Sequence, residues 1–500
     1  MHTGRLKSHV IGWLPTGLAI ASFLIYAATI FALPQVRDSQ YCCEQSSFAA
    51  AVSNIAYGSR IGNMYTGVFD IFIKHFTEPL PQVLKEIGAE LPAQPPGNLS
   101  PTTLDGNGVG YPLVATAAFR LFGFHWWAPV AMMLILMGSS MAAFLRRFPP
   151  TLVTLYFSGL TIMLFTILVW DPALRWQIPV GGIRYFSLVG ILPLFHILLT
   201  LMERQPSRAV APLAVQTTIL MVAAMVRGTA ATAFVAIALV SLVLACDRTR
   251  RSALIRKLAT VGVASVMLVV AVALIVSPEW VTTGRFQTII WTRVLQGLGM
   301  NPGLPIDELN KMYPCEKYVP GGIPASIGDT GSGCIWFAYV IEHNIPIESL
   351  WNKSFGGEFE AAMRSAVFKI VLKYPWETLQ TFVYYKPKAI VDSIKNSLEF
   401  NLSGYLPLPI VLLLASIGVA LFGATTAANT GRETAVVLLT MLFNVTAYMA
   451  AYPGPAVTAD LLLCCLILVS LALGAIFSGG AKLLRAAKTG CKPTVKNQLI

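Results

Sequence analysis

Apolar residues along this chain gather into long runs that are separated by short polar segments. Ten of the runs have about the length, roughly 20 residues, that an α-helix needs to cross a bilayer. They cover residues 10–33, 126–145, 151–170, 184–202, 209–226, 228–245, 258–277, 406–424, 434–451 and 456–477. The pattern predicts an all-α polytopic membrane protein with about ten transmembrane helices.

Two long segments lack such runs and are predicted to lie outside the bilayer. The first covers residues 34–125 and the second covers residues 278–405. Both contain Pro/Gly turns and amphipathic stretches, which is typical of folded segments with juxtamembrane helices. The sequence thus predicts an N-terminal transmembrane module that includes the first external segment (1–277), the second external segment (278–405), and C-terminal transmembrane hairpins with a basic tail (406–500).

Composition supports the membrane class, since 55% of the residues are hydrophobic and only 12% are charged. A soluble protein carries about 25% charged residues. The net charge of +12 comes from basic residues in the tail and in loops that the predicted spans place on one side. These residues are Arg5, Lys7, Arg146, Arg147, Arg204, Arg208, Arg248, Arg250, Arg251, Arg256, Lys257, Arg432, Lys482, Arg485, Lys488, Lys492 and Lys496. The positive-inside rule predicts that this side and both termini are cytoplasmic, so the charge does not indicate nucleic-acid binding.

Established catalytic motifs are absent from the sequence, including the P-loop, the Rossmann fingerprint, GxSxG and HExxH. The six histidines are scattered, which gives little support to a histidine-based metal site. Four cysteines fall in the predicted external segments, where Cys315 and Cys334 could form a disulfide in an oxidising compartment. Free thiols are the equal alternative.

Acidic residues in the first external segment are candidate catalytic groups. Asp38 and Glu44 follow the first predicted span, and Asp105 opens a glycine-rich stretch. A carboxylate at the membrane surface can act as a general base toward a hydroxyl acceptor. Arg120 is suited to bind a phosphate in a bidentate manner. The ordinary alternatives are a solvated loop acid for Asp38, a turn former for Asp105 and an interfacial side chain for Arg120.

The stretch Gly110–Gly123 begins Gly-Tyr-Pro-Leu and ends Arg-Leu-Phe-Gly, after an N-terminal span and an acidic loop. This arrangement resembles GT-C-type integral membrane glycosyltransferases, as do the stretches Ile290–Gly299 and Glu358–Lys388. The resemblance covers the organisation of residues 10–245. It implies transfer of a sugar from a polyprenyl-phosphate donor to a lipid, glycan or protein acceptor at the outer face of a bacterial inner membrane.

The resemblance also implies a catalytic carboxylate in the first external loop, followed by groups that bind the donor. The residues that fit are Asp38, Glu44 and Asp105 for catalysis, and Tyr111, Arg120, Arg184, Arg227 and Arg293 for substrate binding. An arginine or a divalent cation would stabilise the leaving phosphate. The sequence assigns no ligands to such a cation.

Two other classes of function remain open from the sequence. An enzyme like an O-antigen ligase or polymerase would use Arg285, Arg293 and His343 in the second external segment. A transporter usually carries paired charges inside its spans, and this chain has almost none there, Asp460 being the clearest. This argues against transport but not against a non-enzymatic assembly role. The three classes place the site at the acidic loop, at the late arginines or in a central membrane cavity.

Overall fold

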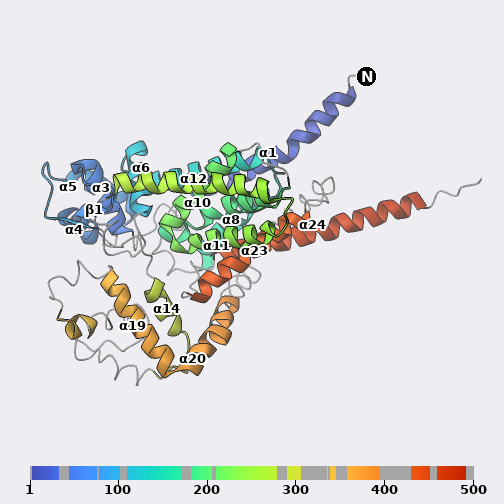
Figure 1. Cartoon of the computed structure of the whole chain (residues 1–500). Coiled ribbons are helices and arrows are strands. Elements are labelled where there is room, and N and C mark those ends of the chain that lie inside the picture. The colour runs from blue at the N-terminus through green and yellow to red at the C-terminus, as the bar shows by residue number, and fades with distance from the viewer. Residues whose placement is uncertain are drawn as a thin grey trace, which may run out of the picture.

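The computed structural model describes most of the chain, in segments separated by gaps. These segments are residues 3–32, 44–75, 78–101, 110–170, 182–204, 210–276, 278, 290–305, 335, 338–344, 357–392, 430–450 and 459–490. Within them the chain is mostly helical, and the described strands form one small sheet. The helices separate into an apolar bundle, a cap at one end of it and a lobe beside it (Figure 1).

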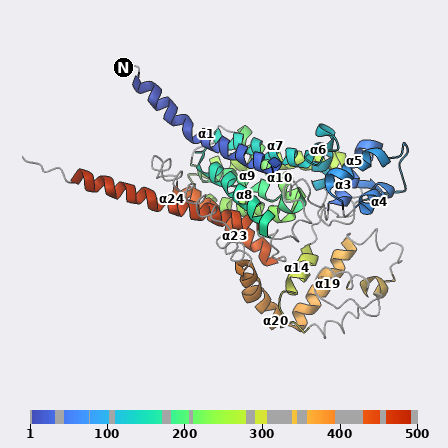
Figure 2. The same cartoon turned by 180° about the vertical axis from the view of Figure 1, so that it is seen from behind.

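The bundle consists of long apolar helices that lie side by side (Figures 1 and 2). They are α1 (Thr3–Ala32), α7 (Ala128–Leu145), α8 (Thr151–Trp170), α9 (Leu188–Met202), α10 (Val210–Val226), α11 (Thr232–Ala245), α12 (Arg251–Ile275), α23 (Thr430–Ala450) and α24 (Ala459–Gly490). Helix α9 is buried from Leu188 to Leu201 and is contacted by α7, α10 and α23. In contrast, α12 exposes Val263, Met267 and Leu274, as a helix that faces lipid does.

The lengths of these helices test the predicted spans. Four apolar stretches are long enough to cross a membrane: Pro15–Ala32, Ala128–Leu145, Arg251–Ile275 and Ala459–Ile476. Four more are apolar but shorter: Thr151–Leu164, Leu188–Met202, Val210–Val226 and Thr232–Ala245. Helix α23 occupies the predicted span 434–451, and the predicted span 406–424 lies outside the described residues. The predicted helical membrane class is confirmed, whereas the number of ten spans stays a prediction.

The cap is built by the first predicted external segment and lies at one end of the bundle (Figure 1). It consists of α3 (Gln45–Tyr57), β1 (Asn63–Tyr65), α4 (Thr66–Lys74), α5 (Leu80–Glu90), β2 (Leu99–Pro101) and α6 (Gly110–Phe122). The two strands pair antiparallel, with Met64 opposite Ser100. Phe48 of α3 is fully buried, and its ring centroid lies 5.9 Å from that of Tyr111 and 5.6 Å from that of Phe119 on α6. This aromatic cluster holds α3 against α6.

The lobe consists of α14 (Ile290–Leu298), α19 (Gly357–Lys373), α20 (Pro375–Gln380) and the π-helical turn η5 (Thr381–Tyr385). It lies beside the bundle in both views (Figures 1 and 2) and has its own apolar core. Glu360 of α19 is buried and satisfies the first amides of α14. Its Oε2 accepts a hydrogen bond from the Trp291 amide (2.8 Å), and its Oε1 accepts one from Thr292 Oγ1 (2.7 Å). A carboxylate at a helix N-terminus is also favoured by the helix dipole.

Lys386 fastens the lobe to the bundle. Its side chain is fully buried, and its Nζ donates a hydrogen bond to the carbonyl oxygen of Met449 at the end of α23 (2.7 Å). The same Nζ lies 4.2 Å from the ring centroid of Phe382, which adds a cation–π contact. Burial lowers the pKa of Lys386 to about 8. One lysine thus satisfies a terminal helix carbonyl and joins two parts of the molecule.

Buried polar contacts also close the bundle at the end away from the cap. The cap end is marked by a bridge between Ile61 and Val276, just beyond α12. Near the other end of α12, Lys257 Nζ donates hydrogen bonds to the carbonyl oxygens of Thr200 and Glu203, each at 2.7 Å. The Glu203 carboxylate pairs with Arg147. The last carbonyls of α9 are therefore satisfied by a side chain of a neighbouring helix.

We expect Lys257→Met to lower the melting temperature of the protein in detergent. The substitution removes the lysine donor from both carbonyl oxygens at the end of α9, and only the Thr200 carbonyl keeps another donor, the Glu203 amide. A buried unsatisfied group costs about 1–3 kcal/mol. Arg256→Met is the matched control because it removes an exposed charge at the position directly before Lys257. Thermal unfolding followed by intrinsic fluorescence compares the two, and equal melting temperatures would contradict this role for Lys257.

Candidate functional site

A buried carboxylate lies where the cap meets the bundle. Glu44 precedes α3 as its N-cap residue and is 1% exposed. Its Oε1 accepts a hydrogen bond from the backbone amide of Ile183 (3.1 Å). Ile183 begins the short 3₁₀ helix η2 (Ile183–Tyr185), which leads into α9. This contact joins the start of the cap to the start of the central bundle helix, and we call the surrounding region the junction.

The start of α6 and the end of α10 meet at the junction in very close contact. A Cβ atom placed on Gly110 would lie 2.2 Å from the carbonyl carbon of Met225, so only glycine fits there. Tyr111 is the next residue and is fully buried against Phe48. Arg227 directly follows α10. The close approach therefore brings the backbone positions of Tyr111 and Arg227 to the same region.

A second buried carboxylate also contacts the start of α9. Asp460, in the first turn of α24, is 4% exposed and accepts a hydrogen bond from Ser187 Oγ through its Oδ1 (2.9 Å). Ser187 is the N-cap residue of α9, four positions after Ile183. Four residues of helix span about 6–8 Å. The two carboxylates thus contact either end of one turn, and Arg184 lies between these contacts in the sequence.

Helix orientation adds to the charge of the junction. The N-termini of α3, α6, α9 and α24 all lie in this region, at Glu44, Gly110, Ser187 and Ala459. A helix N-terminus carries a partial positive charge and unpaired amide groups, which favour anions such as phosphate. The junction therefore brings two carboxylates and several helix N-termini together, with Arg184 and Arg227 close to them in the sequence. This arrangement suits a phosphate-bearing ligand and a proton acceptor.

The structure separates the sequence-predicted site residues into three groups. Glu44, Tyr111, Arg227 and the backbone of Arg184 lie at the junction. Asp38 and Asp105 lie outside the described residues, as do Arg285, Cys315 and Cys334. Arg120 and Arg293 lie elsewhere in the fold. Asp460, which the sequence indicated only as a charge inside a predicted span, joins the first group through Ser187.

Arg120 and Arg293 both have partners away from Glu44. Arg120 is ten residues after the start of α6, or about 15 Å along the helix, and its Nη2 donates to Asn54 Oδ1 at the far end of α3 (2.8 Å). Arg293 lies on α14 in the lobe, where its Nη1 donates to Gln296 Oε1 (2.8 Å). His343 Nδ1 lies 2.9 Å from the carbonyl oxygen of Tyr339.

Comparison with known proteins gives a distant likeness to one enzyme. No protein-family model and no curated protein matches the chain. Two solved structures of ArnT from Cupriavidus metallidurans resemble it, each with a TM-score of 0.30. The apo structure is 13% identical and is covered over 78% of its length by 93% of this chain. The structure bound to undecaprenyl phosphate is 14% identical, with 79% and 95% covered.

ArnT is a GT-C glycosyltransferase, which is the class that the sequence resembles. At a TM-score of 0.30 and 13–14% identity, the likeness carries no argument about the reaction or the substrate of this chain. The residues of the junction are therefore the evidence for the function of this chain.

We expect Gly110→Ala to destabilise the protein, because the added methyl group would collide with the backbone at the end of α10. Overpacking of this kind costs about 1–3 kcal/mol. Gly88→Ala in α5 is the control, since a Cβ there meets no atom within 4 Å and alanine favours the helix by up to about 1 kcal/mol. Melting temperatures in detergent measure both, and a G110A variant as stable as G88A would show that the two helix ends are not in contact.

Proposed function

We propose that this chain is a GT-C-type membrane glycosyltransferase that moves a sugar from a polyprenyl-phosphate donor to a lipid, glycan or protein acceptor. The observation that carries the proposal is the junction, where the buried carboxylates of Glu44 and Asp460 both contact the segment that starts α9, near several helix N-termini. The resemblance of the sequence to this class supports the same assignment. Asp38 and Asp105 remain candidate catalytic acids of the first external segment.

In the proposed reaction, the acceptor hydroxyl oxygen attacks the anomeric carbon of the donor sugar. The bond between that carbon and the phosphate oxygen breaks, and the phosphate leaves with the bonding electron pair. Glu44 takes the proton of the acceptor hydroxyl as a general base. The hydrogen bond from the Ile183 amide to one of its oxygens fixes the orientation of the carboxylate.

The departing polyprenyl phosphate gains negative charge during this step. Arg184, Arg227 and the helix N-termini of the junction are the groups that stabilise this charge in the proposed enzyme. Tyr111, in the first turn of α6, packs against Phe48. A divalent cation is the alternative to an arginine for this role, and Arg120 and Arg293 are assigned to substrate portions further from the reacting atoms.

The proposed location is the bacterial inner membrane, with both termini in the cytoplasm. The bundle end with Arg147 and Lys257 belongs to the basic side predicted by the positive-inside rule. The cap and the junction then face the outer side. A lipid-linked donor can reach them from the bilayer, and an acceptor can reach them from the water phase.

We expect Glu44→Gln to reduce sugar transfer by about 100-fold or more while the protein stays folded. Glutamine keeps a carbonyl oxygen for the Ile183 amide but is no proton acceptor, and general base catalysis contributes about 10²–10⁴ in rate. The assay measures transfer from radiolabelled polyprenyl-phosphate sugars in membranes, with Asp460→Asn as a second variant. Asp70→Asn, an exposed acid on α4, is the control and should keep the wild-type rate.

Two outcomes would contradict the proposal. Wild-type transfer by both Glu44→Gln and Asp460→Asn would remove the junction as the reaction site. Failure of the wild-type protein to use any polyprenyl-phosphate sugar would remove the enzyme class.

A further inference from the structure

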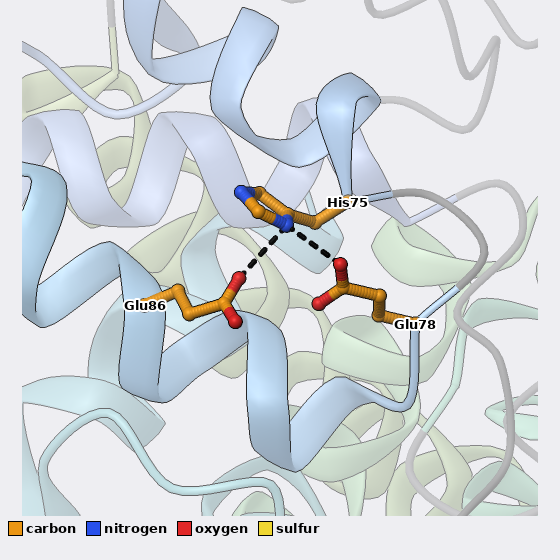
Figure 3. Close-up of side chains that lie close together, drawn as sticks. All are labelled: His75, Glu78 and Glu86. Atoms are coloured by element: carbon orange, nitrogen blue, oxygen red, sulfur yellow. Dashed lines mark hydrogen bonds and ion pairs between the residues drawn. The ribbon is translucent and has the colours of Figure 1, made fainter.

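A cluster of histidine and glutamate side chains lies between α4 and α5, outside the junction. Figure 3 shows Glu78 and Glu86 reaching the same ring nitrogen of His75 from two different positions. His75 Nδ1 is 3.0 Å from Glu78 Oε1 and 2.8 Å from Glu86 Oε2. His75 directly follows α4 and is 8% exposed, while Glu86 lies in the middle of α5.

Hydrogen bonding alone does not satisfy this cluster. An imidazole nitrogen carries at most one hydrogen, so Nδ1 cannot donate fully to two carboxylates. The contact to Glu78 has hydrogen-bond geometry, whereas no described residue donates a hydrogen bond to Glu86 Oε2. Glu78 Oε2 is likewise buried with no donor among the described residues. Two buried carboxylate oxygens therefore lie beside His75 without a hydrogen bond.

The charges of the cluster point to the missing partner. Glu78 and Glu86 bring two carboxylates to a single imidazole ring. Lys74 does not balance them, since its Nζ pairs with Glu90 Oε1 at 3.1 Å. A divalent cation would neutralise the two carboxylates and leave the imidazole uncharged.

We propose that His75, Glu78 and Glu86 bind a divalent transition-metal ion such as Zn²⁺ or Mn²⁺. Their ligand atoms all lie within 4.8 Å of one another. One ion with bonds of about 2.0–2.2 Å brings ligand atoms to roughly 3 Å of each other, close to both separations at Nδ1. A nitrogen ligand with carboxylates suits Zn²⁺ or Mn²⁺, whereas Ca²⁺ and Mg²⁺ prefer oxygen ligands alone.

Glu90 completes the arrangement from behind the imidazole. Its Oε1 lies 3.6 Å from His75 Nε2 and is held by Lys74. The negative charge of Glu90 near Nε2 favours the tautomer with its hydrogen on Nε2, which leaves Nδ1 free to bind the ion. The side chains of Glu78 and Glu86 are 31% and 30% exposed, so water can fill the remaining coordination positions.

A bound ion would join the end of α4 to the middle of α5 and fix the angle between these helices. The site consists of His75, Glu78 and Glu86, and the pair Lys74–Glu90 lies beside it in the cap. It does not depend on the proposed glycosyl transfer, because none of its residues lies at the junction.

Metal binding to the purified full-length protein, without a histidine tag, tests the proposal. The protein is stripped with a chelator and titrated with Zn²⁺ or Mn²⁺ by isothermal calorimetry. We expect one equivalent to bind, with an affinity that falls at least about 100-fold in Glu86→Gln and Glu78→Gln and about 10–100-fold in Glu90→Gln. Asp70→Asn removes an exposed carboxylate from α4, the helix that His75 follows, and this variant should bind the metal as the wild type does.

Thermal unfolding separates a ligand set from a surface that merely attracts cations. Added metal should raise the melting temperature of the wild type and of Asp70→Asn but not that of Glu86→Gln. Equal affinity in the wild type, Glu86→Gln and Glu78→Gln would overturn the proposal, and so would the absence of any stoichiometric binding. Glu78→Gln and Glu86→Gln each remove one carboxylate, so the test remains valid if one of the two variants misfolds.

Discussion

The hydrogen bond from the Ile183 amide to Glu44 is the contact on which the candidate site depends. Burying a carboxylate is costly unless hydrogen bonds compensate it. Here the compensating donor belongs to the segment that starts the central bundle helix, so the cap cannot shift without exposing the charge or leaving it unsatisfied. Asp460 repeats this arrangement one turn later through Ser187. Glu44 therefore joins the cap to the bundle, and Asp460 joins two helices within the bundle, each through a buried carboxylate.

Much of the fold and part of the site could be predicted from local sequence patterns. A helix that crosses a membrane needs a long apolar stretch, so the stretches in α12 and α24 stand out in the sequence without any knowledge of their neighbours. Glu44 was predicted as a candidate because it follows the first span within an acidic segment. Tyr111 was predicted from the stretch that begins at Gly110, and the structure gives the reason for that glycine in the close contact with Met225.

The rest of the site depends on contacts between distant segments, which the sequence pattern does not report. Asp460 is a candidate residue of the junction because the fold brings it to Ser187. The scattered histidines give little support to a metal site in the sequence. The fold nevertheless places His75, just after α4, beside Glu86 of α5. The spacing of Glu86 and Glu90, four apart on one helix face, is the local signal that could have indicated this cluster. Arg120 shows the opposite case, since its hydrogen bond to Asn54 places it at the far end of α6.

The position of the lipid phosphate tests the central claim most directly. A polyprenyl phosphate with a photoreactive group near its phosphate can be cross-linked to the full-length protein in vesicles, and the labelled peptides can be identified by mass spectrometry. Binding at the junction predicts adducts in η2, at the start of α6 and at the end of α10, and loss of the label when unmodified polyprenyl phosphate competes. Labelling confined to α14 and α19, with the junction peptides unmodified, would contradict it.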